Sequence, residues 1–173
     1  MQAETKSAER RFSVRQGTAD DCPAILDFIQ QLADYEKEPD AVKATVDTLQ
    51  ENIFNKGYAE VLIAEQEQDG KKTPVGMALY FYSFSTWTSK PSLYLEDLYV
   101  IPTLRNKGVG KMLFRALGQV AQSKDCGRMD WSVLKWNAPS IAFYEKVLGA
   151  KPMEEWQGMR LETDGIAALA KLA

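Results

Sequence analysis

The sequence predicts one domain of the mixed α/β class, with strands and helices interspersed along the whole chain. The chain has 173 residues, of which 45% are hydrophobic, so it can bury one core without a metal or a disulfide. Segments with helical spacing of apolar residues alternate with short runs rich in β-branched and aromatic residues. Neither an internal repeat nor a linker divides the chain. We expect a flexible polar arm over residues 1–11 and a single domain over residues 12–173.

The first part of the chain predicts two strands and two helices. A short strand over residues 12–15 begins the domain. Pro23 fits only the first turn of a helix and follows two aspartates, so a helix begins near Asp20 and extends to about residue 37. A second helix runs from about Thr45 to a stop at Gly57, and a strand follows over residues 60–65.

A hairpin is predicted in the middle of the chain. Asp69 and Gly70 favour the positive φ of a tight turn, and the apolar, aromatic run 75–84 follows them. We therefore expect the strands on either side of this turn to be antiparallel neighbours. Residues 85–91 form a loop, and residues 92–100 form a strand rich in Leu, Tyr and Val.

The clearest helix lies in the second half of the chain. Apolar residues keep strict helical spacing at Val109, Met112, Leu113, Ala116, Leu117, Val120 and Ala121. A strand over residues 129–134 follows, and Asn137 caps a helix that ends near residue 149. We expect a last strand near Arg160 and Leu161, and a short amphipathic helix from Asp164 onward.

The composition excludes several classes of function. The chain has no histidine, which removes Ser-His-Asp and Cys-His catalysis and His-ligated zinc. The net charge is −3, which argues against a nucleic-acid-binding surface and is compatible with a cationic substrate. The two cysteines form no metal-binding motif, so we expect reduced thiols and no metal.

A membrane location is not expected. The longest apolar run, residues 75–82, is far below the roughly 18 residues that a spanning helix needs. The N-terminal residues contain no apolar signal region. We therefore expect a cytoplasmic protein with neither a membrane nor a nucleic acid as partner.

The first feature that carries chemistry is the loop RNKGVG, from Arg105 to Gly110. It lies between a strand and the long helix, where free backbone N–H groups favour an anion such as a phosphate. A tight strand-to-helix turn that simply needs glycine explains the same residues. The loop has neither the Walker A pattern nor the third glycine of the dinucleotide motif.

The second feature is Tyr144, which lies one turn after Ile141 and one turn before Leu148 and hence on the buried face of its helix. It is either a core tyrosine or a proton donor. With an ordinary pKa of about 10, the phenol is protonated at neutral pH and can donate to a departing thiolate.

The third feature is the pair Glu96 and Asp97 within a strand. Regular alternation places the two side chains on opposite faces, so only one of them can face a given cleft. The alternatives are an edge-strand charge and a structural ion pair.

These features, in this order, resemble the GNAT superfamily of acetyl-CoA-dependent N-acetyltransferases over residues 12–161. Five segments look like the diamine acetyltransferases, the family of the spermidine/spermine and thialysine acetyltransferases. They are LADYEKE, SLYLEDLYV, RNKGVGK, KWNAPSIAFYEKVLGA and the loop that holds Trp87. The resemblance implies a GNAT-like central mixed, largely antiparallel sheet flanked by helices, and a homodimer with substrate sites near the subunit boundary.

The resemblance also implies a reaction, in which the amine nitrogen attacks the thioester of acetyl-CoA directly and no acyl-enzyme forms. The acceptor is the primary amine of a small substrate: a thialysine-like amino acid, a diamine or a polyamine. Glu96 accepts the ammonium proton through water, because an alkylamine is a nucleophile only when it is deprotonated. Tyr144 protonates the thiolate of CoA.

Binding residues follow from the matching positions. Those implied for acetyl-CoA are Leu98, Tyr99, Val100, Arg105, Asn106, Lys107, Gly108, Val109, Gly110, Lys111, Asn137, Ala138, Pro139, Ser140 and Tyr144. Those implied for the amine are Tyr35, Glu36, Ser85, Trp87, Glu96, Asp97, Asp130, Trp131 and Ser132.

Two differences from the family pattern bear on which amine is the substrate. Ser85 stands in a Ser-Thr-Trp sequence similar to the thialysine enzyme, where the spermidine enzyme has an acidic residue before Pro-Trp, and this weakens the case for a long polycation. The segment 154–160 carries a shifted Trp, so its substrate contacts stay unassigned. Two further functions fit the sequence: acetylation of protein or peptide amines, and a non-catalytic acyl-CoA sensor.

Overall fold

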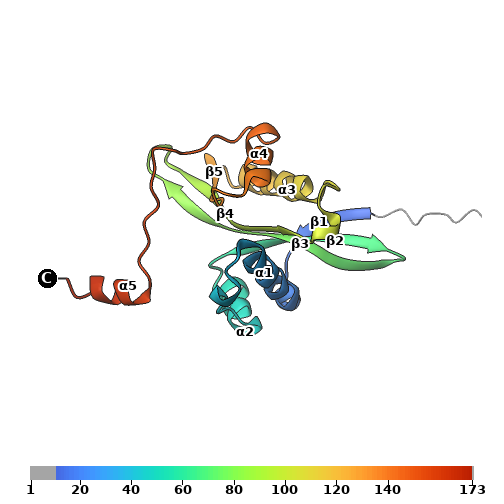
Figure 1. Cartoon of the computed structure of the whole chain (residues 1–173), viewed down its shortest axis with the longest axis horizontal. Helices are drawn as coiled ribbons and strands as arrows, with labels where there is room; N and C mark the ends of the chain where they lie inside the picture. The colour runs from blue at the N-terminus through green and yellow to red at the C-terminus, as the bar shows by residue number, and fades with distance from the viewer. Residues whose placement is uncertain (1–10, 173) are drawn as a thin grey trace, which may run out of the picture. The chain divides into compact units, whose positions relative to one another are not determined.

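The computed structural model describes residues 11–172, which form two compact units with the boundary after Ser132 (Figure 1). The predicted arm lies outside the described residues except for Arg11, which is the first residue of β1. The assignment of residues 12–173 to one domain stays a prediction. Each unit is described by itself below.

The first unit contains five strands and three helices. The strands are β1 Arg11–Gln16, β2 Glu60–Gln68, β3 Lys71–Ser85, β4 Lys90–Val100 and β5 Arg128–Trp131. The helices are α1 Cys22–Glu36, α2 Val46–Leu49, which continues as the π-helical segment Gln50–Asn55, and α3 Val109–Ser123. Short 3-10 turns lie at Ala19–Asp21, Pro39–Ala41 and Pro102–Leu104.

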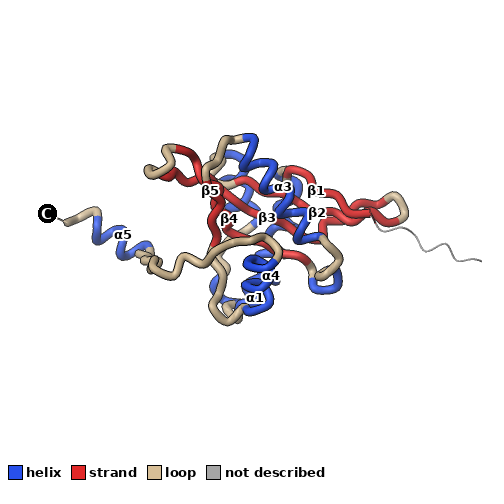
Figure 2. Tube along the Cα trace, turned by 90° about the horizontal axis from the view of Figure 1, so that it is seen from above, coloured by secondary structure: helices blue, strands red, loops and turns tan. Residues whose placement is uncertain are grey.

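The five strands form one sheet in the order β1-β2-β3-β4-β5. The first three pairings are antiparallel and the last, β4 with β5, is parallel, which confirms the mixed, largely antiparallel sheet. Helices α1 and α2 cover one face and α3 covers the other (Figure 1). Figure 2 shows the strands in red, side by side, with α3 across them.

Apolar residues of the helices build the core on both faces of the sheet. On one face, Cys22, Ile25 and Phe28 of α1 are buried in a cluster with residues of β2, β3 and β4. On the other, Leu113 and Leu117 of α3 are fully buried, as their helical spacing predicts. Helix α1 ends at Glu36 because Lys37 adopts left-handed backbone, with φ of 67°.

A buried ion triad joins the start of the chain to the sheet. The Arg15 guanidinium donates to both carboxylate oxygens of Asp21, at 2.7 and 2.8 Å, and its Nε donates to Glu65 at 2.8 Å. Both carboxylates are buried, whereas the Arg15 side chain is 37% exposed. The hydrogen bonds from Arg15 hold the pKa of Asp21 below its usual range. The triad therefore stabilises the fold only while Asp21 is ionised.

Arg15→Gln is expected to destabilise the protein at pH 7 by about 1–2 kcal/mol, since the half-exposed guanidinium leaves two buried carboxylates unpaired. Because the pKa of Asp21 is depressed in the folded state, this stability is lost as the pH falls below about 4. Urea unfolding at pH 7 and pH 3 measures both effects. Arg115→Gln, on the exposed side of α3, is the charge-matched control. An equal loss at both pH values would contradict the electrostatic role of the triad.

The second unit contains α4 Ala138–Lys146 and α5 Thr163–Leu169. The predicted strand near Arg160 and Leu161 is wrong: residues 147–162 contain no strand. A strand persists only where its backbone groups pair with a neighbour, and this segment has no ladder partner among the described residues. The strand predicted over residues 129–134 also ends earlier, at Trp131.

Candidate active site

A β-bulge lies at the acidic pair of β4. Leu79 pairs with Asp97 and Tyr80 pairs with Leu95, so Glu96 is an extra residue in β4. The prediction that Glu96 and Asp97 alternate regularly to opposite faces is therefore wrong, since a bulge interrupts the alternation. Glu96 is therefore the residue of β4 that has no pairing partner in β3.

Three carboxylates gather at the bulge and at the end of α1. Burial, followed by the charges of Glu96 and Glu36, raises the pKa of Asp97 to about 6. Burial also raises the pKa of Glu36, which is the last residue of α1. None of the ion pairs within residues 11–172 involves these three groups. The acid cluster of Glu36, Glu96 and Asp97 is thus a negatively charged site without an ion pair among the described residues.

The acid cluster is not arranged as a metal site. No group of three or more Cys, Asp or Glu residues in the described part of the chain could hold a metal ion. The same charges attract an ammonium group, which needs no coordination geometry.

The end of β5 lies beside β4 just before the bulge. Trp131 pairs with Leu95, and the Ser132 hydroxyl is 2.9 Å from the hydroxyl of Tyr94. The Trp131 ring packs edge-on against Phe114 of α3, with 5.6 Å between ring centroids. The structure therefore places the predicted amine residues Asp130, Trp131 and Ser132 next to the strand that carries the acid cluster.

The edge of β4 is open beyond this point. Its ladder with β5 ends at Leu95, but β4 continues to Val100, so residues 96–100 have no strand partner on that side within residues 11–172. Backbone groups on such an edge can pair with an extended ligand. The predicted cofactor residues Leu98, Tyr99 and Val100 lie on this open edge.

The predicted phosphate loop follows the open edge and leads into α3. Asn106 and Gly108 have positive φ, 61° and 89°, and Gly108 is the N-cap of α3. The first bond of α3 joins the Met112 N–H to the Gly108 carbonyl, so the N–H groups of residues 109–111 have no acceptor in the helix. A Cβ on Gly108 or Gly110 would meet open space. Exposed Lys107 and Lys111 add positive charge, so the loop fits a phosphate group.

Arg105, predicted as a cofactor residue, is engaged elsewhere. Its guanidinium carbon lies 5.1 Å from the ring centroid of Tyr35 and 5.7 Å from that of Tyr99. Its Nε donates to the Val100 carbonyl at 3.1 Å. The side chain therefore lies between the end of α1 and the end of β4.

Gly110→Ala is expected to weaken CoA binding about tenfold, because the added methyl group occupies the open space at the loop. Folding stability should stay equal or rise by about 0.5 kcal/mol, since alanine favours a helix more than glycine does. Gly118→Ala, in the same helix and also facing open space, is the control and should leave CoA affinity unchanged. Calorimetric titration with CoA and thermal unfolding measure the two quantities. Equal CoA affinity in both variants would contradict a ligand at Gly110.

Two predicted amine residues lie away from the acid cluster within one chain. Ser85 is the last residue of β3 and pairs with Lys90, and Trp87 is in the turn that follows. The seven strand residues from Lys90 to Glu96 span roughly 20 Å. Trp87 is 79% exposed, and the Arg128 guanidinium lies 5.8 Å from its ring.

The second unit holds the other predicted cofactor residues. The Asn137 side chain accepts from the Ser140 N–H at 3.4 Å and caps α4, and Pro139 lies in the first turn, as predicted. The Tyr144 ring packs edge-on against Phe143 at 5.8 Å. Within this unit Tyr144 is half-buried, as are Ile141 and Leu148, whereas residues 145–147 are exposed.

Sequence reasoning missed Gln31 and Tyr94. Gln31 Oε1 accepts from the Tyr99 hydroxyl at 2.6 Å, and Tyr94 bonds to Ser132 as described. Gln31 lies one helical turn before Tyr35, and that spacing is the signal that assigns it to the same face of α1. Tyr94 carried no such signal.

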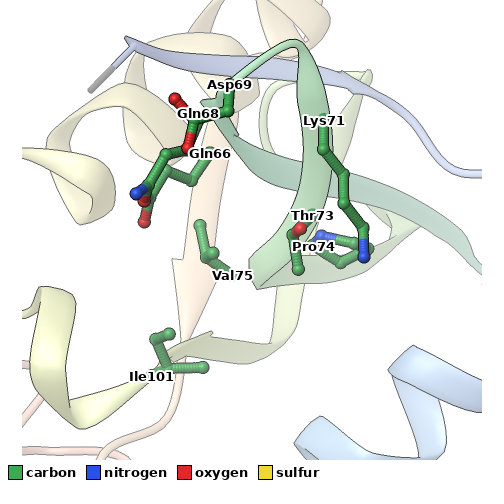
Figure 3. A pocket seen from close by; sticks show the side chains of 8 residues that line it. All are labelled: Gln66, Gln68, Asp69, Lys71, Thr73, Pro74, Val75 and Ile101. Carbon is green, nitrogen blue, oxygen red and sulfur yellow. The ribbon is translucent and has the colours of Figure 1, made fainter. Parts of the chain in front are cut away.

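A shallow hollow at the β2–β3 hairpin is separate from these groups. Figure 3 shows Gln66 and Gln68 on one side of it and Lys71 and Thr73 on the other. None of its lining residues belongs to the predicted site.

None of the helices within residues 11–172 has the length and apolar character that a membrane span requires.

Comparison with known proteins places the chain in one family. Residues 25–150 match the model of the acetyltransferase (GNAT) family. A thialysine N-epsilon-acetyltransferase from Sus scrofa is 36% identical over 91% of this chain and 96% of its own length. A human spermidine/spermine N(1)-acetyltransferase-like protein is 33% identical over 92% of this chain and 24% of its own. An integron cassette protein from V. cholerae has a TM-score of 0.74 at 25% identity, over 93% of this chain and 98% of its own. The chain therefore belongs to the acetyltransferase (GNAT) family, whose members use acetyl-CoA.

Proposed function

We propose that the protein transfers acetyl from acetyl-CoA to the primary amine of a small cationic substrate, such as a thialysine-like amino acid, a diamine or a polyamine. The observation that carries the proposal is the acid cluster beside the open edge of β4. The cluster offers three carboxylates, none of which forms an ion pair within residues 11–172, so it favours an ammonium group. The similarity to enzymes named for thialysine and for spermidine or spermine supports the same substrate class.

In this proposal, binding and proton transfer are assigned to the following residues. The loop from Asn106 to Lys111 holds the phosphates of acetyl-CoA, and the backbone of Leu98 to Val100 receives its extended arm. When bound, acetyl-CoA supplies the acetyl group as an activated thioester. Asp97 and Glu36 attract the ammonium group, and Glu96 accepts its proton through water. Tyr144 donates a proton to the departing thiolate.

The test is release of free thiol from acetyl-CoA by the purified protein. Thialysine, putrescine, spermidine and a lysine-containing peptide are offered separately. We expect turnover with thialysine or short diamines, in line with Ser85 in place of an acid. Preference for the peptide would establish protein acetylation instead. CoA binding without turnover of any amine would favour the sensor function.

We also propose a homodimer, in which Ser85 and Trp87 of the hairpin lie near a subunit boundary. Light scattering tests this, because a mass equal to the single-chain mass of 19.4 kDa would reject it.

A further inference from the structure

Arg105 begins the phosphate loop, but its side chain contacts the end of α1 and the end of β4. The guanidinium lies over two aromatic rings, 5.1 Å from Tyr35 and 5.7 Å from Tyr99. These distances are within the range of cation–π attraction. The Nε hydrogen bond to the Val100 carbonyl fixes the orientation of the same group. Three contacts thus direct Arg105 away from the loop in which it stands.

The two rings belong to the elements that carry the acid cluster. Tyr35 precedes Glu36 in the last turn of α1, and Tyr99 is two residues after Asp97 in β4. The Tyr99 hydroxyl donates to Gln31 at 2.6 Å, which ties β4 to α1 one turn earlier. Arg105 therefore forms a second connection between α1 and β4, the two elements that carry the three carboxylates.

We infer that Arg105 is a positioning residue, which joins the phosphate loop to the amine site and does not itself bind phosphate. The inference rests on the proposed function, because it concerns the amine of that reaction. Asn106, its chain neighbour, begins the loop that holds the cofactor. A fixed Arg105 links the position of that loop to the position of Tyr35 and Glu36.

The chemistry of the contacts requires arginine. A planar guanidinium stacks on two rings and still donates through Nε, whereas a lysine ammonium carries the charge without the plane. Lysine at position 105 therefore keeps the charge but loses the arrangement. If Arg105 instead bound phosphate, lysine at this position would preserve its role, since lysine serves well as a phosphate ligand.

The experiment compares Arg105→Lys and Arg105→Gln with wild type. We expect both variants to raise the KM for the amine about fivefold, with kcat and the Kd for CoA within about twofold of wild type. Arg115→Gln, an exposed arginine of α3, is the charge-matched control and should change none of these. Weaker CoA binding in the Gln variant that Lys restores would assign Arg105 to phosphate and overturn the inference.

A double-mutant cycle with Tyr35 separates positioning from general damage to the fold. Tyr35→Leu removes the ring and should raise the amine KM about fivefold on its own. If Arg105 acts through that ring, the double variant with Arg105→Gln stays near fivefold and does not reach the product of the two effects. A multiplicative effect, or a parallel loss of thermal stability and of CoA affinity, would overturn the inference.

Different results would overturn the proposed function and the inference about Arg105. If the wild-type protein acetylates no amine, the proposed function fails and the inference fails with it. If wild type is active and the Arg105 variants lose CoA affinity alone, only the inference fails.

Discussion

Asp97→Asn is expected to stabilise the protein at pH 7 and to remove most of its activity toward amines. Burial and the charges of Glu96 and Glu36 raise the pKa of Asp97 to about 6. In the unfolded chain an aspartate titrates near pH 4, at about 3.9. The folded state therefore binds this proton more tightly, and folding becomes less favourable as the pH rises from about 4 to about 6.

The stability effect follows from that difference. At pH 7 the ionised Asp97 costs on the order of 2 kcal/mol, and asparagine, which has the same shape and no charge, avoids the cost. At pH 4 the carboxyl of the folded state is protonated, and the two proteins should unfold at nearly the same urea concentration. Urea unfolding at both pH values measures the difference. Asp69→Asn, in the exposed turn between β2 and β3, is the control and should shift stability by less than about 0.5 kcal/mol.

The activity effect has the opposite sign. An ammonium held by a carboxylate inside a half-buried site loses that attraction when the acid becomes an amide, so kcat/KM for the amine should fall on the order of 100-fold. In wild type, kcat/KM should rise as the pH passes through about 6, because the ionised form of Asp97 binds the cation. Asp97→Asn should lose this step. Wild-type kcat/KM in the variant, or a variant no more stable than wild type at pH 7, would remove Asp97 from the amine site.

The stability effect and the activity effect of Asp97→Asn thus have one cause, the charge of Asp97 among other acids. The charges of Glu96 and Glu36 act on Asp97 although the acids repel one another, and none of the three forms an ion pair within residues 11–172. Such a cost is typical of a site whose missing charge arrives with a ligand.

The parts of the fold that follow from local sequence were predictable. The spacing of Val109, Leu113 and Leu117 identifies α3, and Asp69-Gly70 identifies the turn, where both residues have positive φ. Such patterns act over a few residues, so the sequence shows them without knowledge of the tertiary contacts.

The geometry at the site was not predictable in the same way. The bulge at Glu96 depends on how β3 and β4 align over their whole length, and neither strand carries a local mark of it. The motif around Arg105 predicts a phosphate ligand. Its side chain instead contacts Tyr35 and Tyr99, which are about 70 and 6 positions away in the chain, and a local motif does not report such contacts. The predicted strand at Arg160 fails because pairing, and not composition, decides whether a short segment is a strand.

Tyr144→Phe is expected to lower kcat about 100-fold and to leave the Kd for CoA within about twofold of wild type. The Tyr144 hydroxyl carries a proton that a departing thiolate can take. Phenylalanine keeps the ring and its edge-on contact with Phe143, so the fold of α4 should persist. The change removes one hydroxyl group and with it the proton.

The control and the affinity for CoA decide what that hydroxyl does. Tyr58→Phe removes an equivalent group from a tyrosine that is 69% exposed, and it should leave kcat unchanged. If Tyr144→Phe turns over at the wild-type rate, the thiolate takes its proton from water and the assignment of Tyr144 as proton donor fails. If kcat and the affinity for CoA fall together, the hydroxyl of Tyr144 serves to bind the cofactor and not to donate a proton.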